Sequence, residues 1–434
     1  MSDEQRPTIP RDHVIVQKLQ HFNREQPPER FVHAKGSAAH GFFETTEDVS
    51  QLTRAGLFQK GVMTPLFLRF STGSGEPGGA DTARDPRGFA IKLYTEEGNY
   101  DLVGNNTPVF FIRDAAKFPD LVHAQKRQPD TGMRSNDMQW DFWTLSPESA
   151  HQVTILMSDR GTPRTLRHMN GYGSHTFSWI NAGGEKFWVK YHFKTAQGIE
   201  NHTEAEALAI AAEDPDAHRR DLRRAIEAGE APEWRLEVQV MPFEDAAAYR
   251  FNPFDLTKVW PHGDYPPIPV GRLVLDRNPE HFFNEVEQSG FSPANLVPGI
   301  GLSPDRMLIG RIFSYHDTHL QRIGANYEQL PINSSRGPAD SSGAATAEAI
   351  WSLEPEDLRR YADARHAEDD DFGQAGTLYR EVMDERQRAE LVANVVRHAS
   401  AEVSAEVQER VVAYWTQVDS VLGARVDAGL KVAP

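Results

Sequence analysis

The sequence predicts an α+β protein in which a closed or curved antiparallel sheet is followed by a helical C-terminal region. Two clear runs of alternating apolar and polar residues cover 187–193 and 234–240, and shorter ones cover 66–71, 88–95 and 108–112. A period of two is typical of half-buried strands, and hairpin-like spacing favours a sheet that curves or closes. Near the C-terminus the apolar period becomes helical instead. The chain therefore combines a β domain with a helical domain.

Before the sheet, residues 1–22 form an arm that leads into a short amphipathic helix. The apolar positions of this helix are Val14, Val16, Leu19 and Phe22. The β domain then covers residues 23–270. It contains a helical insertion that opens with a capping box at Thr203–Glu206 and ends near Gly229. A segment over 271–346 follows, and its last part, 333–346, is a linker rich in Ser, Gly and Ala.

The C-terminal helical domain covers residues 347–434. Ser352 and Asp384 are expected to cap the N-termini of helices. One apolar stripe is expected to pack into the core of this domain, and it consists of Val407, Val411, Tyr414, Val418 and Val421.

Composition excludes several classes of protein. The 434 residues carry a net charge of −17, so the surface should repel nucleic acid and anionic membranes. The sequence contains no cysteine, which excludes disulfides, thiolate-bound haem and cysteine-ligated zinc. No apolar run has membrane-spanning length, and residues 1–12 have no hydrophobic signal region, so we expect a cytoplasmic protein.

One pair of residues points to a particular chemistry. Tyr315 follows Arg311 by one helical turn, so the guanidinium can lie against the phenol oxygen. A permanent cation favours phenolate over phenol, and a phenolate is a hard anionic ligand that suits ferric iron. An ordinary half-buried pair has the same spacing, so this motif alone does not decide between the two interpretations.

Further motifs accompany this pair in a fixed order. They are RFVHAKG at 30–36, RFST at 69–72, DLVGNNTP at 101–108, NPFDLTKVWPH at 252–262 and GRIFSYHDTH at 310–319. In this order they resemble the haem catalases, and the resemblance runs from about residue 20 to about residue 335. It implies an eight-stranded antiparallel β-barrel, a wrapping segment over 271–346 that carries the haem-ligand helix, and a C-terminal helical domain.

The resemblance also implies an activity, the disproportionation of hydrogen peroxide to water and dioxygen through a ferryl intermediate. The cofactor is then haem b with its iron. His33 resembles the histidine that moves a proton between the peroxide oxygens, and Asn105 resembles the amide that hydrogen-bonds the departing oxygen. Ser71 resembles the residue that fixes the histidine tautomer. Taken singly, such residues are usually core or turn residues, and only their joint order favours the functional interpretation.

On the other side of the haem, the resemblance makes Tyr315 the axial ligand of the iron. Arg311 would polarise Tyr315, and the relay would extend to His175 and Asp305. Arg30, Arg69 and Arg322 resemble the partners of the two haem propionates. The remaining residues assigned to the haem pocket are Val32, Phe110, Phe118 and His319.

A second cofactor, NADPH, is implied because catalases of this smaller-subunit type often hold it in a surface cleft. The matching residues are His151, Ser158, Arg160, Asn170, Tyr172, Lys194, Val259, Trp260 and His262. Ile155 stands where an aromatic residue is common. Scattered polar surface residues would give the same pattern, so that alternative stays open beside the NADPH site.

The chain departs from the family at a few positions. Gly73 replaces the valine that narrows the peroxide channel, which predicts a wider neck, unless neighbouring groups refill the space. Asp85 matches the channel carboxylate, whose charge should orient peroxide. His316 stands where proline is usual, and Leu320–Gln321 replace a basic pair.

The expected assembly is a homotetramer. A dimer is the alternative, because the arm and the linker look short. Two other functions stay open. One is a haem peroxidase or peroxide-rearranging enzyme on the same scaffold, and the other is a non-enzymatic protein that binds haem or NADPH.

Overall fold

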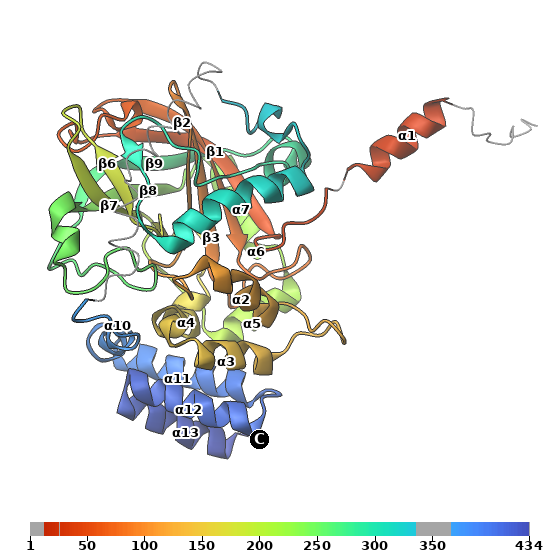
Figure 1. Cartoon of the computed structure of the whole chain (residues 1–434). Coiled ribbons are helices and arrows are strands. Elements are labelled where there is room, and N and C mark those ends of the chain that lie inside the picture. Colours follow the sequence, from red (N-terminus) through yellow and green to blue (C-terminus); the bar gives the residue numbers. More distant parts are fainter. Residues whose placement is uncertain (1–12, 26, 336–365, 434) are drawn as a thin grey trace, which may run out of the picture.

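The computed structural model describes residues 13–25, 27–335 and 366–433. Its centre is a closed antiparallel ring of strands, in which β9 returns to pair with β1 (Figure 1). The eight strands of the ring are β1 (Gly36–Thr45), β2 (Met63–Thr72), β3 (Arg87–Thr95), β4 (Gly98–Asn105), β5 (Gly171–Tyr172), β7 (Lys186–Thr195), β8 (Glu233–Pro242) and β9 (Ile268–Arg277). Two short strands extend the sheet beyond the ring, β6 (Phe177–Ile180) on β7 and β10 (Ile300–Gly301) on β6. The barrel expected from the resemblance is confirmed.

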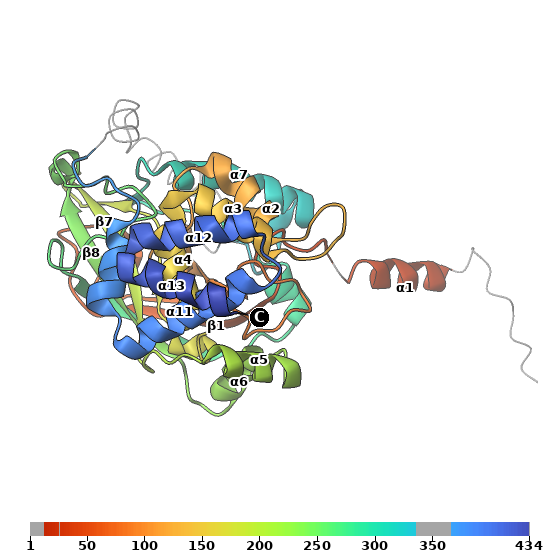
Figure 2. The ribbon, with the colours of Figure 1, turned by 90° about the horizontal axis from the view of Figure 1, so that it is seen from below.

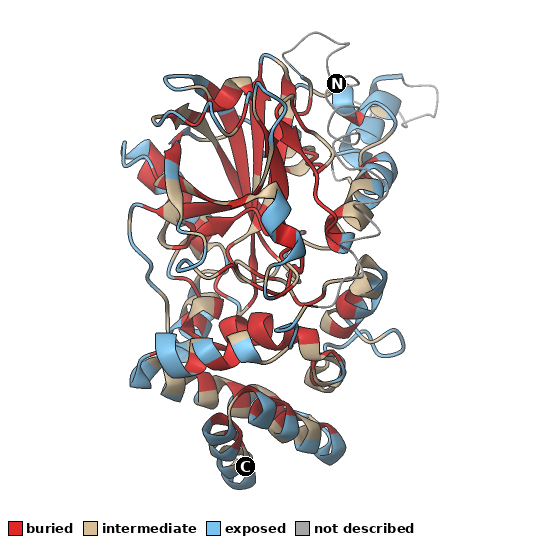
Figure 3. Cartoon of the chain, turned by 60° about the vertical axis from the view of Figure 1, so that its left-hand side comes forward, coloured by how far each residue is buried: buried red, intermediate tan, exposed pale blue. Residues whose placement is uncertain are grey.

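The barrel is buried on both faces because other segments cover it. On β2, the side chains of Leu66, Leu68 and Phe70 point into the main core, as the alternation predicts. Phe67 points outward, yet it is fully buried under Val286 and Phe291 of the following segment. Figure 3 shows the buried residues concentrated in the strands. The segment after the barrel therefore wraps it rather than forming a core of its own.

The sequence prediction is wrong at one strand. Residues 108–112 form an irregular connection, although Val109, Phe111 and Ile112 are buried as in a strand. Pro108 cannot donate a ladder hydrogen bond, and the Phe110 amide bonds Leu256 O outside the ring. β1 and β4 carry no clear alternation and were not predicted. The boundary expected after residue 270 falls inside β9.

Helices connect the barrel to the C-terminal part. α2 (Phe118–Gln125), α3 (Asn136–Leu145) and α4 (Ala150–Met157) lie between β4 and β5. The insertion consists of α5 (Glu204–Glu213) and α6 (Ala217–Glu227), and the capping box of Thr203 with Glu206 is confirmed.

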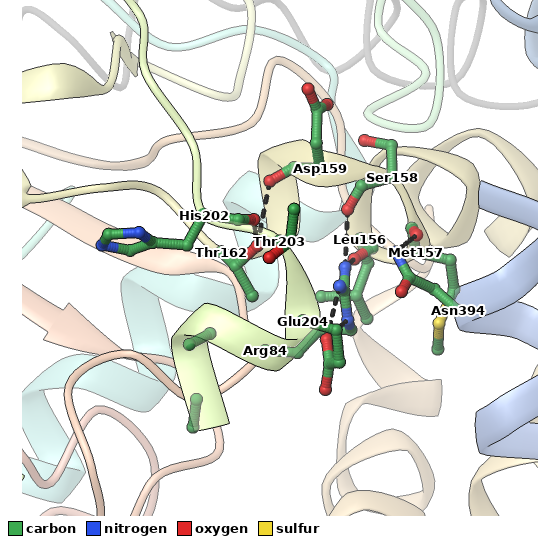
Figure 4. Close-up of polar contacts among 12 residues, drawn as sticks. Arg84, Leu156, Met157, Ser158, Asp159, Thr162, His202, Thr203, Glu204 and Asn394 are labelled. Carbon is green, nitrogen blue, oxygen red and sulfur yellow. Dashed lines mark hydrogen bonds and ion pairs between the residues drawn. The ribbon is translucent and has the colours of Figure 1, made fainter. Parts of the chain in front are cut away.

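Arg84 fastens these parts to one another (Figure 4). It donates from Nε to Glu204 of α5 at 2.8 Å and from Nη1 to the carbonyl oxygen of Leu156 in α4 at 2.7 Å. Asn394 of the C-terminal part donates to the Met157 carbonyl at 2.9 Å beside it.

The C-terminal helices form a layer beneath the barrel (Figures 1 and 2). They are α10 (Gly373–Thr377), α11 (Glu385–Ser400), α12 (Ala405–Val418) and α13 (Ser420–Val432). Asp384 caps α11 in a capping box, as expected. Four members of the predicted apolar stripe are buried, but Val421 is 60% exposed, because α12 ends at Val418 and Val421 lies in the first turn of the next helix. Ser352 and most of the linker lie outside the described residues.

Two further helices flank the barrel. α7 (Arg306–Arg322) runs along its outside, and α1 (His13–Asn23) stands away from the body with no buried residue (Figure 1). The described residues also form short helical turns: η1 (Gly56–Phe58), η2 (Ala115–Lys117), η3 (Pro147–Ser149), η4 (Asp159–Gly161), η5 (Leu166–His168), η6 (Phe243–Ala247), η7 (Phe282–Glu287), η8 (Tyr327–Gln329) and η9 (Leu378–Val382). Among the described helices, none is both long and apolar enough to cross a membrane.

The stripe on α12 generates a test with a matched control. Val411→Ala should lower the free energy of unfolding by about 1.5–3 kcal/mol, because two buried methyl groups are lost and a cavity remains. Val421→Ala, the same change at an exposed position, should stay within about 0.5 kcal/mol of the parent. Denaturant unfolding followed by circular dichroism measures both. Equal shifts in the two variants would contradict the register of the helices.

Candidate active site

A line of hydrogen bonds crosses from the start of α7 to the middle of the same helix. Asp305 caps the helix, since its Oδ1 accepts from the amides of Met307 and Leu308 at 2.8 and 3.1 Å. Its other oxygen lies 2.6 Å from His175 Nδ1. His175 Nε2 in turn lies 2.7 Å from Arg311 Nη1. Arg311 Nη2 then donates to the phenol oxygen of Tyr315 at 2.7 Å.

Electrostatics fix the direction of this line. Burial lowers the pKa of His175, the Asp305 carboxylate raises it, and Arg311 lowers it again, with a net downward shift. The neutral ring therefore carries its proton on Nδ1, facing Asp305, and accepts from Arg311 on Nε2. Arg311 Nη2 also donates to the Val103 carbonyl on β4 at 2.9 Å, which holds the guanidinium in place. The result is a fixed cation beside the Tyr315 oxygen.

His33 lies on the segment that enters β1, close enough to Arg311 for that charge to act on its ring. Its backbone has a φ of 59°, an uncommon conformation for a residue other than glycine, and its amide donates to Gly73 O at 2.9 Å. The Nδ1 atom lies 2.9 Å from Ser71 Oγ. The pKa of His33 falls to about 3, first because of burial and then because of the positive charges of Arg69 and Arg311. The ring is therefore neutral at pH 7.

Gly88 on β3 makes room for this pair. A Cβ at Gly88 would lie 2.3 Å from Ser71 Oγ and 2.9 Å from His33 Nδ1. The strand partner of Gly88 on β4 is Asn105, which is half-buried. Three separate sequence motifs therefore supply His33, Ser71 and Asn105, and the fold places these residues around one glycine.

Three arginines gather at one side of the site; Arg69 and Arg322 are buried, and Arg30 is half-buried. Arg30 and Arg322 both donate to the carbonyl oxygens of Glu287 and Ser289. Arg69 donates to the carbonyl oxygens of His33 and Ala34.

The charges of these arginines are not balanced by the described residues around them. The Glu287 carboxylate bonds Arg30 at 3.3 Å and is the one carboxylate that raises the pKa of Arg30, Arg69 and Arg322. Burial nevertheless lowers the pKa of Arg30 to about 10, and burial together with the charge of Arg30 lowers that of Arg322 to about 9. The Nε atoms of Arg69 and Arg322 are buried and lack a hydrogen-bond partner among the described residues. Such a cluster fits an anionic ligand.

Three apolar residues that the resemblance assigns to the haem pocket remain partly accessible. Val32, Phe110 and Phe118 are half-buried, and both phenylalanines pack at the edge of the second hydrophobic cluster. Gly310 brings α7 close to that edge, since a Cβ there would lie 2.3 Å from the Cβ of Ala115. His319 follows Tyr315 by one turn, with ring centroids 6.1 Å apart, and its Nε2 bonds the Phe291 carbonyl at 2.7 Å.

Comparison with known proteins decides the family. The family model described as Catalase matches residues 1–355, and the model described as Catalase-related immune-responsive matches residues 365–430. The chain belongs to the catalase family. This family implies a haem cofactor.

Individual relatives agree with this assignment. The chain is 52% identical to the bromoperoxidase-catalase of Streptomyces venezuelae, over 98% of this chain and 94% of that protein. It is also 52% identical to a catalase of Methanosarcina barkeri, over 98% of this chain and 90% of that protein. Among solved structures, a bacterial catalase superposes with a TM-score of 0.94 at 49% identity, covering 100% of this chain and 93% of that chain.

The residues expected to hold NADPH fall into two linked groups. Asn170 Nδ2 donates to the Tyr172 phenol at 3.2 Å, Lys194 lies over that ring, and Arg160 is close enough to lower the pKa of Tyr172. Exposed His262 lies beside them, with its ring 5.8 Å from that of His192.

The second group lies deeper. Gln374 of α10 bonds the amide and the carbonyl of Val259, at 2.9 and 3.0 Å, and burial lowers the pKa of His151 to about 4. Trp260 is fully buried. Ser158 caps the turn that carries Arg160. The side chain of Gln374 therefore already bonds both backbone groups of Val259.

The expected gap at Gly73 is largely filled. A Cβ there would lie 3.1 Å from Pro86 Cγ and 3.2 Å from Asp85 Oδ1, and Gly73 is not in the left-handed region. Asp85 is buried, which raises its pKa, and its Oδ2 accepts from the amides of Ser74 and Gly75. These contacts support the alternative that neighbours refill the position. His316, at the other departure, bonds Tyr327 at 3.0 Å.

Sequence reasoning missed several residues that shape the site. Gly88 leaves space for His33 and Ser71. The Val103 carbonyl accepts a hydrogen bond from Arg311, and Glu287 supplies a counter-charge to the arginines. Gly88 follows Arg87 directly within a strand, and an isolated glycine in a strand signals a close approach. Glu287 carries no comparable signal.

Gly88 provides the test of this geometry. Gly88→Ala should lower dioxygen evolution by roughly 100-fold, because the new methyl group pushes Ser71 and His33 out of position. Gly78→Ala is the control, since a Cβ at Gly78 meets nothing within 4 Å and its φ is ordinary. Initial rates on haem-loaded proteins measure the effect. Normal activity in Gly88→Ala would show that the bond between His33 and Ser71 is not needed.

Proposed function

We propose that this protein disproportionates hydrogen peroxide to water and dioxygen on a haem held between His33 and Tyr315. The observation that carries the proposal is the line from Asp305 through His175 and Arg311 to the Tyr315 oxygen. A chain of oriented groups behind a single oxygen atom is the usual support for a metal ligand. A neutral base lies across from it. Neither of the other functions left open by the sequence gains support from these contacts.

Tyr315 would be the protein ligand of the haem iron, and Arg311, which donates to its oxygen at 2.7 Å, would hold that oxygen in place. Within the described residues, no three His, Asp or Glu side chains are grouped so that they could hold a metal ion by themselves. A single phenolate therefore suits a metal that brings its other ligands with it. When bound, the haem iron supplies the redox chemistry of both half-reactions.

The three arginines fit the two propionates of haem. Arg30, Arg69 and Arg322 present unbalanced positive charge, including two Nε atoms without a partner. Two carboxylates would supply the missing acceptors and counter-charges. Val32, Phe110, Phe118 and His319 would line the porphyrin. On a surface with a net charge of −17, such a local cluster is needed to hold a dianion.

His33 would move the protons. Its Nδ1 is engaged by Ser71, which leaves Nε2 to take a proton from one peroxide oxygen and deliver it to the other, so that water departs. The amide of Asn105 would hydrogen-bond the departing oxygen. In the second half-reaction His33 would carry a proton of the second peroxide as dioxygen forms. Ser71 holds the ring in one tautomer throughout.

We also propose that the basic face around Tyr172 accepts NADPH. Arg160, Lys194 and His262 are cationic or polar groups that suit its phosphates. The ligand would displace Gln374 from Val259 in order to reach the deeper group.

For the assembly, we propose a homotetramer, with a dimer as the alternative, located in the cytoplasm. The exposed apolar residues of α1, such as Leu19 and Phe22, would then pack against another copy.

Removal of the Tyr315 oxygen tests whether Tyr315 is the ligand of the haem iron. Tyr315→Phe should lose haem during purification, so that its Soret absorbance per protein falls to near background. Tyr327→Phe is the control, because Tyr327 is a buried phenol nearby that bonds His316 and Glu328 rather than the relay. If Tyr315→Phe retained the haem content of the parent, the ligand would have to be another residue.

The depressed pKa of His33 predicts an unusual pH profile. An unperturbed histidine titrates near pH 6.5, whereas His33 should stay neutral until the pH approaches about 3. Dioxygen evolution should therefore remain level as the pH falls through 6.5. A lowered histidine pKa contributes stability that is present above the unfolded value and is lost as the pH falls toward the folded one. The eventual loss of activity in acid should thus coincide with unfolding.

Initial rates and circular dichroism recorded at the same pH values check this profile. A rate that halves near pH 6.5 while the dichroism is unchanged would contradict a neutral, buried His33.

A further inference from the structure

A row of aromatic rings leads from the haem pocket into the C-terminal helices. Phe110 contacts Phe111 with ring centroids 5.5 Å apart, and Phe111 stacks on Trp143 at 6.2 Å with the planes nearly parallel. Trp143 contacts Trp140 at 5.1 Å, and Trp140 contacts Trp415 of α12 at 6.3 Å. The three indoles are at most 1% exposed. We call Trp140, Trp143 and Trp415 the indole cluster.

The indole cluster differs from the other described tryptophans in its hydrogen bonding. On the barrel side, each indole N–H has an acceptor: Trp179 donates to Tyr191, Trp188 to Phe243, Trp234 to Met169 and Trp260 to Pro253. In the indole cluster, no Nε1 atom has a hydrogen-bond partner within the described part of the chain. A buried polar group usually has one, so three such groups in mutual contact require an explanation.

We propose that the indole cluster is a one-electron donor to the oxidised haem site, a role that rests on the proposed function. Cleavage of the first peroxide would release one water, and its second oxygen atom would stay at the site until two electrons and two protons reduce it to water. The site is then two electrons short. A second peroxide normally restores both electrons and is oxidised to dioxygen. When peroxide is scarce, Trp143 supplies one electron instead, and the deficit spreads over Trp140 and Trp415.

Because the indole N–H groups lack hydrogen-bond acceptors among the described residues, the missing electron can pass from one indole to the next. An oxidised indole becomes a cation, and it stays one as long as no acceptor takes the Nε1 proton. His398 contacts both Trp140 and Trp143, but burial lowers its pKa to about 4, which makes it a poor proton acceptor. No bond then has to break when the electron moves between rings. Burial also disfavours the cation, so only a strongly oxidising site can draw the electron.

Tyr414, the next ring beyond Trp415, does not continue the path. Its ring centroid lies 5.5 Å from that of Trp415, but its phenol bonds Ser149 Oγ at 2.9 Å, and a serine hydroxyl is no base. Loss of an electron from a phenol requires loss of its proton, for which no acceptor is present there among the described residues. The deficit therefore rests on the indoles. An external one-electron donor, such as a phenol, refills them and releases its own proton.

Rapid-freeze electron paramagnetic resonance on the haem-loaded protein tests the proposal. Peracetic acid oxidises the site without acting as the second peroxide. The parent should then give a protein radical whose line shape narrows when its tryptophans are ring-deuterated. Trp143→Phe should abolish this signal. Trp188→Phe, which removes an equally buried indole from the barrel, should retain it. Dichroism and haem content verify the fold of each variant.

Three outcomes would overturn the proposed role of the indole cluster. The first is an unchanged radical signal in Trp143→Phe, and the second is an equal loss of the signal in Trp188→Phe. The third is a parent signal that ring deuteration does not change, and this test does not depend on the folding of any variant. Dioxygen evolution from hydrogen peroxide is measured on the same samples. Normal dioxygen evolution without a tryptophan radical refutes only electron donation by the indole cluster, whereas absence of dioxygen evolution refutes the proposed function.

Discussion

The contact between Arg311 and the Tyr315 oxygen is the interaction on which the rest of the structure depends. Helical spacing alone brings the two residues within reach, but it leaves the guanidinium free to turn toward solvent. Three other residues remove that freedom. The Val103 carbonyl on β4 accepts a hydrogen bond from Nη2, and His175 Nε2 accepts one from Nη1. Asp305 orients His175 while it caps α7. The phenol oxygen therefore has a fixed cation beside it only when β4, the segment after β5 and the start of α7 are in place together.

A second constraint is the handling of charge in a buried space. His33 is held neutral, and three arginines are held close together with a single carboxylate among them. Burial of unbalanced cations is costly, and a protein tolerates it where a ligand supplies the counter-charge. The chain as a whole is strongly acidic, yet this local excess of positive charge lies where the proposed haem propionates would bind. Stability and cofactor binding are thus linked at the same residues.

Much of the fold could be predicted from the sequence, and the failures have physical causes. Alternation located β7 and β8 because each has one apolar and one polar face. It misplaced a strand at 108–112, where apolar residues are buried in an irregular connection that Pro108 enforces. It placed Val421 in the core because a helical stripe does not reveal that Asp419 ends one helix and starts another.

Recognition of the family from its motifs supplied the residues of the site, and the structure adds how they are held. No motif indicates that Gly88 provides the space for His33, because the reason is a contact between strands. The indole cluster was equally hidden, since Trp140 and Trp143 lie in one helix and Trp415 is remote in sequence. Unpaired N–H groups become visible only once the partners of every tryptophan are known.

Resonance Raman spectroscopy of the haem-loaded protein tests the central claim most directly. Excitation into a ligand-to-metal band should enhance ring modes of a coordinated tyrosinate, and ring-deuterated tyrosine should shift them. Such modes are expected in the parent protein, and they should shift when its tyrosines are ring-deuterated, because excitation in this band enhances only a coordinated tyrosinate. A spectrum without tyrosinate modes, or with modes of an imidazole ligand, would contradict the assignment of Tyr315 and the role of the line of residues behind it.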